Sequence, residues 1–138
     1  MGKKFWIAVA VMFVLGMLLD FVVHAVLLQA DYLALPALYR SEQDAAPFFP
    51  YMLLAHALMA GGFVWVYQQG RSDAAWFAQG MRFGMAMTIL LTVPGYLIYY
   101  AVQPLPQLLV LKQIIFGVLQ TLILGVAVAW LARPAPAA

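Results

Sequence analysis

The sequence predicts an all-α protein, a transmembrane four-helix bundle, and three observations lead to that prediction. Of the 138 residues, 67% are hydrophobic and only 9% are charged. The mean hydropathy is +0.95, far above that of a soluble domain. Four apolar segments follow one another, each reaching or approaching the ~20 residues that a helix needs to cross ~30 Å of hydrocarbon. We therefore expect one integral membrane domain over residues 1–138, with the lipid bilayer as its first partner.

The four predicted spans cover residues 5–28, 50–68, 74–102 and 106–132. The first follows two lysines, as a secretory signal would, but its apolar run is too long and Leu28-Gln29-Ala30 is a poor cleavage site. We therefore expect an uncleaved helix. The third span contains Pro94 followed by Gly95, which predicts a bend that exposes polar backbone.

The connections between the spans differ in length and character. The extracytoplasmic loop 29–49 is longer than the turns that usually join antiparallel helices, and its tyrosines, phenylalanines and leucines predict an anchor on the membrane surface. The other two connections are a short polar turn near residue 70 and a proline-fixed turn near residue 104. The Pro- and Ala-rich tail 133–138 is expected to be disordered.

The distribution of charge predicts orientation and excludes some functions. An up-down-up-down bundle with both termini cytoplasmic places five basic residues on the inner side: Lys3, Lys4, Arg71, Arg82 and Arg133. We therefore expect a multi-pass protein of the bacterial inner (plasma) membrane. The basic residues stand at segment ends and form no patch, which argues against nucleic acid as a partner. The absence of cysteine excludes disulfides and thiol chemistry.

Titratable residues inside the apolar spans predict a functional layer. The first span holds Asp20 and His24, the second holds His56, and the fourth holds Lys112. At 1.5 Å per residue all four lie at roughly one depth, in the outer half of the bundle. Such groups are costly in hydrocarbon and often mark a binding site or a proton path. Asp20 and His24 are four residues apart, so the carboxylate is expected to accept a hydrogen bond from the imidazole.

Two further residues complete the predicted site. Tyr96 follows the expected bend of the third span, and Gln113 follows Lys112 in the fourth. The predicted ligand or proton site consists of Asp20, His24, His56, Lys112, Tyr96 and Gln113. The alternative is purely structural, because polar side chains in membrane bundles often only hydrogen-bond across helices, and Lys112 can extend to the interface.

A haem b group or a metal ion is an alternative occupant of this layer. His24 and His56 lie at matched depth on neighbouring antiparallel helices, the arrangement of a bis-imidazole haem b in an electron carrier. Alanines and glycines around His56 leave space for such a group. A zinc ion normally takes more ligands than these two histidines. The sequence leaves the cofactor undecided.

Coupled transport is the other alternative. A membrane-embedded acid such as Asp20 can bind a proton in competition with a cation. A chain this small would act as a homo-oligomer, and the close-packing motif Gly80-x-x-x-Gly84 with Gly117 and Gly125 could support one.

Three short segments carry a resemblance to other proteins. These are residues 19–24, the loop with Tyr39-Arg40 that leads to the run 50–56 ending at His56, and Arg82-Phe83-Gly84. Together they resemble small bacterial four-helix inner-membrane proteins that carry no assigned function, so the resemblance implies a fold and no activity. The sequence shows no nucleophile with a base beside it, and no catalytic residue is predicted. The expected role is non-enzymatic, as a binding protein or an accessory component of a larger membrane complex.

Overall fold

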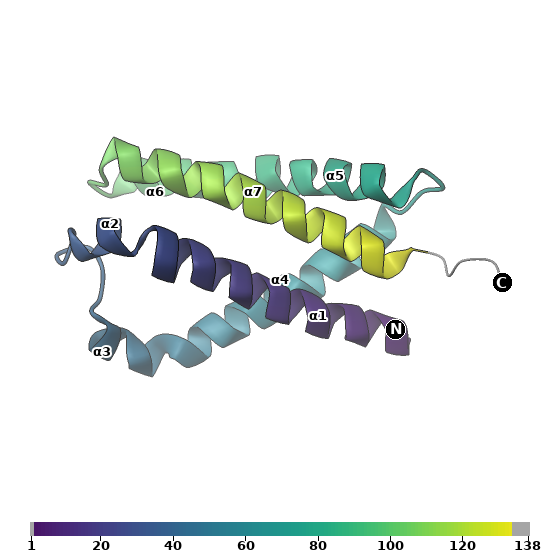
Figure 1. The fold of residues 1–138 in the computed structure, drawn as a ribbon, viewed down its shortest axis with the longest axis horizontal. Helices are drawn as coiled ribbons and strands as arrows, with labels where there is room; N and C mark the ends of the chain where they lie inside the picture. Colours follow the sequence, from purple (N-terminus) through teal and green to yellow (C-terminus); the bar gives the residue numbers. More distant parts are fainter. Residues whose placement is uncertain (1, 134–138) are drawn as a thin grey trace.

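The computed structural model describes residues 2–133, and within this range the chain contains helices and no strand (Figure 1). Four helical stretches are long and apolar enough to cross a membrane: Lys3–Leu27, Glu42–Gln69, Trp76–Val102 and Gln107–Ala132. The prediction of an all-helical protein with four membrane-length helices is confirmed. The tail that the sequence predicts to be disordered lies outside the described residues from position 134 onward.

Each long stretch is built from one or more helical elements. The first joins α1 (Lys3–Asp20) to the π-helical η1 (Phe21–Leu27), and the second joins α3 (Glu42–Ala45) and η2 (Ala46–Phe48) to α4 (Phe49–Gln69). The third consists of α5 (Trp76–Met87), the π-helical η3 (Thr88–Thr92) and α6 (Val93–Val102). The fourth is the single helix α7 (Gln107–Ala132), and the short helix α2 (Gln29–Leu33) lies in the first connection.

The long helices pack in two pairs. The stretch α5–η3–α6 runs alongside α7, whereas α4 packs against α1 and crosses it steeply (Figure 1). The start of α1, the turn between α4 and α5, and the end of α7 lie toward one end of the bundle, and α2 and α3 lie toward the other (Figure 1). Many large apolar side chains face outward, among them Leu58, Ile89 and Leu119, as a hydrocarbon environment requires.

Close contact between α5 and α7 depends on three glycines. A Cβ atom added at Gly125 would lie 2.5 Å from the carbonyl oxygen of Gly80 and 2.7 Å from Cα of Gly84. Only glycine permits the two backbones to approach so closely. The motif Gly80-x-x-x-Gly84 is therefore used for packing inside one chain, and this face is covered by α7.

Two apolar clusters hold the pairs together at opposite ends. One joins α1, α4 and α7 and consists of Phe5, Ala8, Met12, Ala60, Val64, Tyr67, Val128 and Ala129. The other lies beneath α2 and consists of Val23, Leu28 and Leu109, with Tyr32, Leu35, Tyr39 and Phe116 packed against it. Between these clusters the two pairs separate, and that separation contains the site described next.

The two π-helical turns interrupt the helices at this level. In η1 the amide of Leu28 donates to the carbonyl of Val23, five residues back, at 2.9 Å. The turn η3 ends at Thr92, two residues before Pro94, whose nitrogen cannot donate and whose ring crowds the preceding turn. Turns of this kind often occur at functional sites because they change which side chains share a helix face.

Candidate functional site

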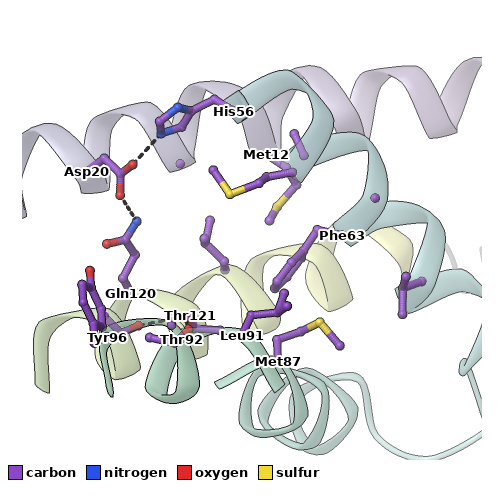
Figure 2. Close-up of a pocket in the computed structure, with 18 of the residues that line it drawn as sticks. Met12, Asp20, His56, Phe63, Met87, Leu91, Thr92, Tyr96, Gln120 and Thr121 are labelled. Atoms are coloured by element: carbon purple, nitrogen blue, oxygen red, sulfur yellow. Dashed lines mark hydrogen bonds and ion pairs between the residues drawn. The ribbon is translucent and has the colours of Figure 1, made fainter. Parts of the chain in front are cut away.

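A cavity of about 590 Å³ lies between α1, η1 and α4 on one side and η3, α6 and α7 on the other. Most of its wall is apolar, formed by Met12, Met59, Ala60, Phe63, Val66, Met87, Leu91 and Leu124. Its polar lining consists of Asp20, His24, His56, Thr92, Tyr96, Tyr99, Gln120 and Thr121. Figure 2 shows the labelled polar groups Asp20, His56, Gln120 and Tyr96 together, away from Met12, Phe63 and Met87. The cavity is thus amphipathic.

Glycines at the wall create much of this space. Gly16, Gly62, Gly95 and Gly117 all line the cavity. A Cβ added at Gly117 would lie 2.8 Å from Cγ2 of Thr92 in η3 and 2.9 Å from Cε2 of Tyr96 in α6, so that glycine also permits both elements to pack on α7. A Cβ added at Gly62 or Gly95 would meet no atom within 4 Å. At these two positions the cavity wall has room for a larger side chain.

Asp20 is the centre of the polar group and joins three helices. It is the last residue of α1, and its Oδ2 lies 2.5 Å from Nε2 of His56 in α4. Its other oxygen, Oδ1, accepts a hydrogen bond from Nε2 of Gln120 in α7. The His56 side chain is 8% exposed and that of Asp20 is 30% exposed, so the carboxylate is the more accessible partner.

The surroundings of His56 constrain where its protons lie. Nδ1 of His56 is 2.8 Å from the carbonyl oxygen of Met52, one turn earlier in α4. A carbonyl oxygen can only accept, so Nδ1 carries a proton. Nε2 then shares a second proton with Asp20, because a bare imidazole nitrogen and a carboxylate would both be acceptors at 2.5 Å. The pair is either imidazolium with carboxylate or neutral imidazole with carboxylic acid.

His24 belongs to a second hydrogen-bonded group. Its Nδ1 lies 2.6 Å from the hydroxyl oxygen of Tyr32 in α2, which also accepts from Nε2 of Gln113 at 3.2 Å. Burial is the main cause that raises the pKa of Tyr32 to about 12, opposed by the hydrogen bond from Gln113. The expected hydrogen bond between Asp20 and His24 is replaced by this one. The helix becomes π-helical directly after Asp20, so the α-helical spacing on which that expectation rested does not apply.

Lys112 forms an ion pair outside the cavity. Its Nζ donates to both carboxylate oxygens of Asp31 in α2, each at 2.9 Å. Lys112 and Gln113 therefore hold α2 onto the N-terminal end of α7. Of the six predicted site residues, Asp20, His24, His56 and Tyr96 line the cavity, and the other two fasten the helix beside it.

Comparison of the chain with protein-family models, curated proteins and solved structures gave no match. The function has to be argued from the cavity itself.

Five residues that the prediction did not include take part in these groups: Gln120, Thr92, Thr121, Asp31 and Tyr32. Gln120 binds Asp20, and the only sequence signal for it is its spacing of seven residues, two helical turns, from Gln113. Thr121 donates to the carbonyl of Gly117 at 2.8 Å, so its oxygen accepts from Thr92 of η3, also at 2.8 Å. Asp31 and Tyr32 lie in the first connection, where hydrophobic periodicity gives no position relative to the bundle.

His56 is not arranged as a free ligand for haem or metal. Both ring nitrogens of His56 are engaged, by Met52 and by Asp20. Axial coordination by His56 would require Asp20 to leave Nε2. Among residues 2–133 no group of three or more histidine, cysteine, aspartate or glutamate side chains is placed to hold a metal ion.

Proposed function

We propose that the protein is a non-enzymatic membrane protein that binds a small amphipathic molecule from the lipid phase. The observation that carries this proposal is the cavity, whose apolar wall ends at the Asp20–His56–Gln120 group. An apolar body would lie against the methionines and Phe63, while a polar group would reach the carboxylate. Electrostatic contacts in such a low-dielectric site are stronger than in water, so the polar group would determine which molecule binds.

The packing around the cavity supports a binding role over a purely structural one. Structural polar groups are normally covered by the helices they join, but the Asp20 side chain remains 30% exposed beside the cavity. Gly62 and Gly95 leave space that no neighbouring atom fills.

The orientation of the protein belongs to the same proposal. We place the bundle in the bacterial inner membrane, in an up-down-up-down arrangement with both termini cytoplasmic. Support comes from Lys3, Lys4 and Arg71, which belong to the end of the bundle where α1 begins and α4 ends (Figure 1). The polar end of the cavity would then lie in the outer half of the membrane, near α2.

Native mass spectrometry tests the binding role with a pair of matched variants. Gly62→Leu adds a side chain at the cavity wall, whereas Gly61→Leu adds the same side chain one position earlier in α4, where the residue does not line the cavity. Wild-type protein and Gly61→Leu, purified from the producing membrane in mild detergent, are expected to retain the same small molecule. Gly62→Leu is expected to lose it. Equal spectra for the two variants would contradict the proposal.

A small proton-coupled transporter is the second candidate, favoured by the proton that Asp20 and His56 share. It predicts pH-dependent flux of a cation that disappears in Asp20→Asn. The haem alternative is less favoured because His56 has no free nitrogen. An accessory role in a larger membrane complex is compatible with the cavity and predicts partners that co-purify with the chain.

A further inference from the structure

We propose that the molecule bound in the cavity is an amphipathic cation and that its binding releases one proton from the Asp20–His56 pair. This inference rests on the proposed function and specifies the chemistry of the ligand. Three features of the cavity support it: the hydrogen bonds of His56, the charges of the lining residues and the exposure of Asp20.

The charges of the residues that line the cavity favour a positively charged ligand. Asp20 is the only carboxylate among the lining residues, and no lysine or arginine lines the cavity within the described chain. Lys112 of α7, which lies outside the cavity, is already bound to Asp31 by two hydrogen bonds. A positively charged ligand therefore has a matching partner in Asp20, whereas an anionic ligand has no fixed cation to meet.

The Asp20–His56 pair holds a proton that a bound cation would replace. Because the carbonyl of Met52 fixes a proton on Nδ1 of His56, Nε2 and Asp20 together hold one more. The pair is then electrically neutral in either of its proton positions. A cation that takes the place of His56 at the carboxylate leaves Asp20 ionised and His56 as a neutral imidazole protonated on Nδ1. The shared proton leaves to solvent, so the charge of the site is the same before and after binding.

The carboxylate of Asp20 is accessible to a ligand in the cavity. Asp20 is more exposed than His56 and its oxygens are divided between two partners, so a ligand can approach Oδ2 from the cavity while Gln120 keeps Oδ1 in place. The other titratable groups that line the cavity are His24 of η1, and Tyr96 and Tyr99 of α6. His24 is hydrogen-bonded to Tyr32, and α7 contributes the uncharged Gln120. Protons released from His24 would also enter the proton count, so the experiment needs a control for this residue.

Calorimetric titration of the whole protein in lipid nanodiscs tests the inference. The probe is decyltrimethylammonium, whose charge is independent of pH, and decanol is the neutral control of equal chain length. Titration in two buffers of different ionisation enthalpy gives the number of protons released. We expect one proton per cation and none per decanol. Affinity for the cation should rise about tenfold per pH unit, as release of one proton requires.

The variants separate the parts of the account. Asp20→Asn should lose the preference for the cation while it still binds decanol. His24→Gln should still release one proton per bound cation. Equal binding of cation and decanol without proton release, with both lost in Gly62→Leu, would overturn this inference and leave the binding role intact. If Gly62→Leu bound both probes as well as the wild type does, the binding role would be overturned too.

Discussion

Nε2 of His56 lies 2.5 Å from Oδ2 of Asp20, and this contact joins the last residue of α1 to the first part of α4. The two helices cross and share an apolar cluster that includes Met12 and Ala60. The Asp20–His56 pair is a polar link between them in addition to this cluster. The pair thus has a structural role in addition to its proposed role in binding.

Removal of the carboxylate is expected to destabilise the bundle. Asp20→Ala leaves Nε2 of His56 and the amide of Gln120 without their acceptor, and should lower the free energy of unfolding by about 1–3 kcal/mol. Unfolding by sodium dodecyl sulfate, followed by circular dichroism in mild detergent, measures the change. Glu42→Gln, at an exposed position of α3, is the control and should change stability by less than about 0.5 kcal/mol. Equal stability of the two variants would contradict the structural role of Asp20.

The glycine contact between α5 and α7 gives a second prediction. Gly125→Ala places a Cβ 2.5 Å from the backbone oxygen of Gly80, so the helices must separate. We expect a loss of about 1–3 kcal/mol, typical of overpacking. Gly61→Ala, where an added Cβ meets nothing within 4 Å, should be neutral or stabilising, by up to about 1 kcal/mol, because alanine is the better helix former. If both variants unfolded together, the close contact would not exist.

Tyr32 predicts a stability change at high pH. Its pKa is raised from 10.0 to about 12 in the folded protein, mainly by burial. The folded state therefore keeps this proton where the unfolded chain loses it. The stability that this residue contributes is complete below pH 10 and declines as the pH rises toward 12. Comparison of wild type with Tyr32→Phe from pH 9 to 12 should show a smaller decline in the variant. Parallel curves would show that Tyr32 is not the group responsible.

Cysteine labelling tests the proposed orientation, since the natural sequence has no cysteine. Ala45→Cys lies in α3 and Ser72→Cys in the turn before α5, and both positions are exposed. In intact cells a membrane-impermeant maleimide should label Ala45→Cys strongly and Ser72→Cys only after the membrane is opened. The reverse result would place both termini outside.

The sequence was sufficient to predict the helical fold because membrane-length apolar runs are a strong signal. It also identified Asp20, His24 and His56 from the rarity of titratable groups inside those runs, and Tyr96 from its place after the expected bend, and all four line one cavity. It did not predict which side chains bond to which. That failure has a local cause at Asp20, where the change to π-helix in η1 alters the face that His24 occupies.

The first connection was the other part that the sequence could not resolve. Its apolar side predicted a surface anchor, but nothing in its pattern indicated that Asp31 would bind Lys112 or that Tyr32 would bind His24. Contacts between residues so far apart in the chain depend on how the helices rotate and cross. A single sequence contains little information on those two quantities.

Photolabelling in a bilayer tests the central claim, that the cavity binds an amphipathic molecule, most directly. An alkylammonium probe bearing a diazirine in its chain is activated in nanodiscs that contain wild type, Gly62→Leu or Gly61→Leu, and the labelled residues are mapped by mass spectrometry. The account predicts label on Met59, Phe63 and Leu91 in wild type and Gly61→Leu, reduced by unlabelled probe and weak in Gly62→Leu. Equal label at these residues in all three proteins, unaffected by competitor, would contradict it.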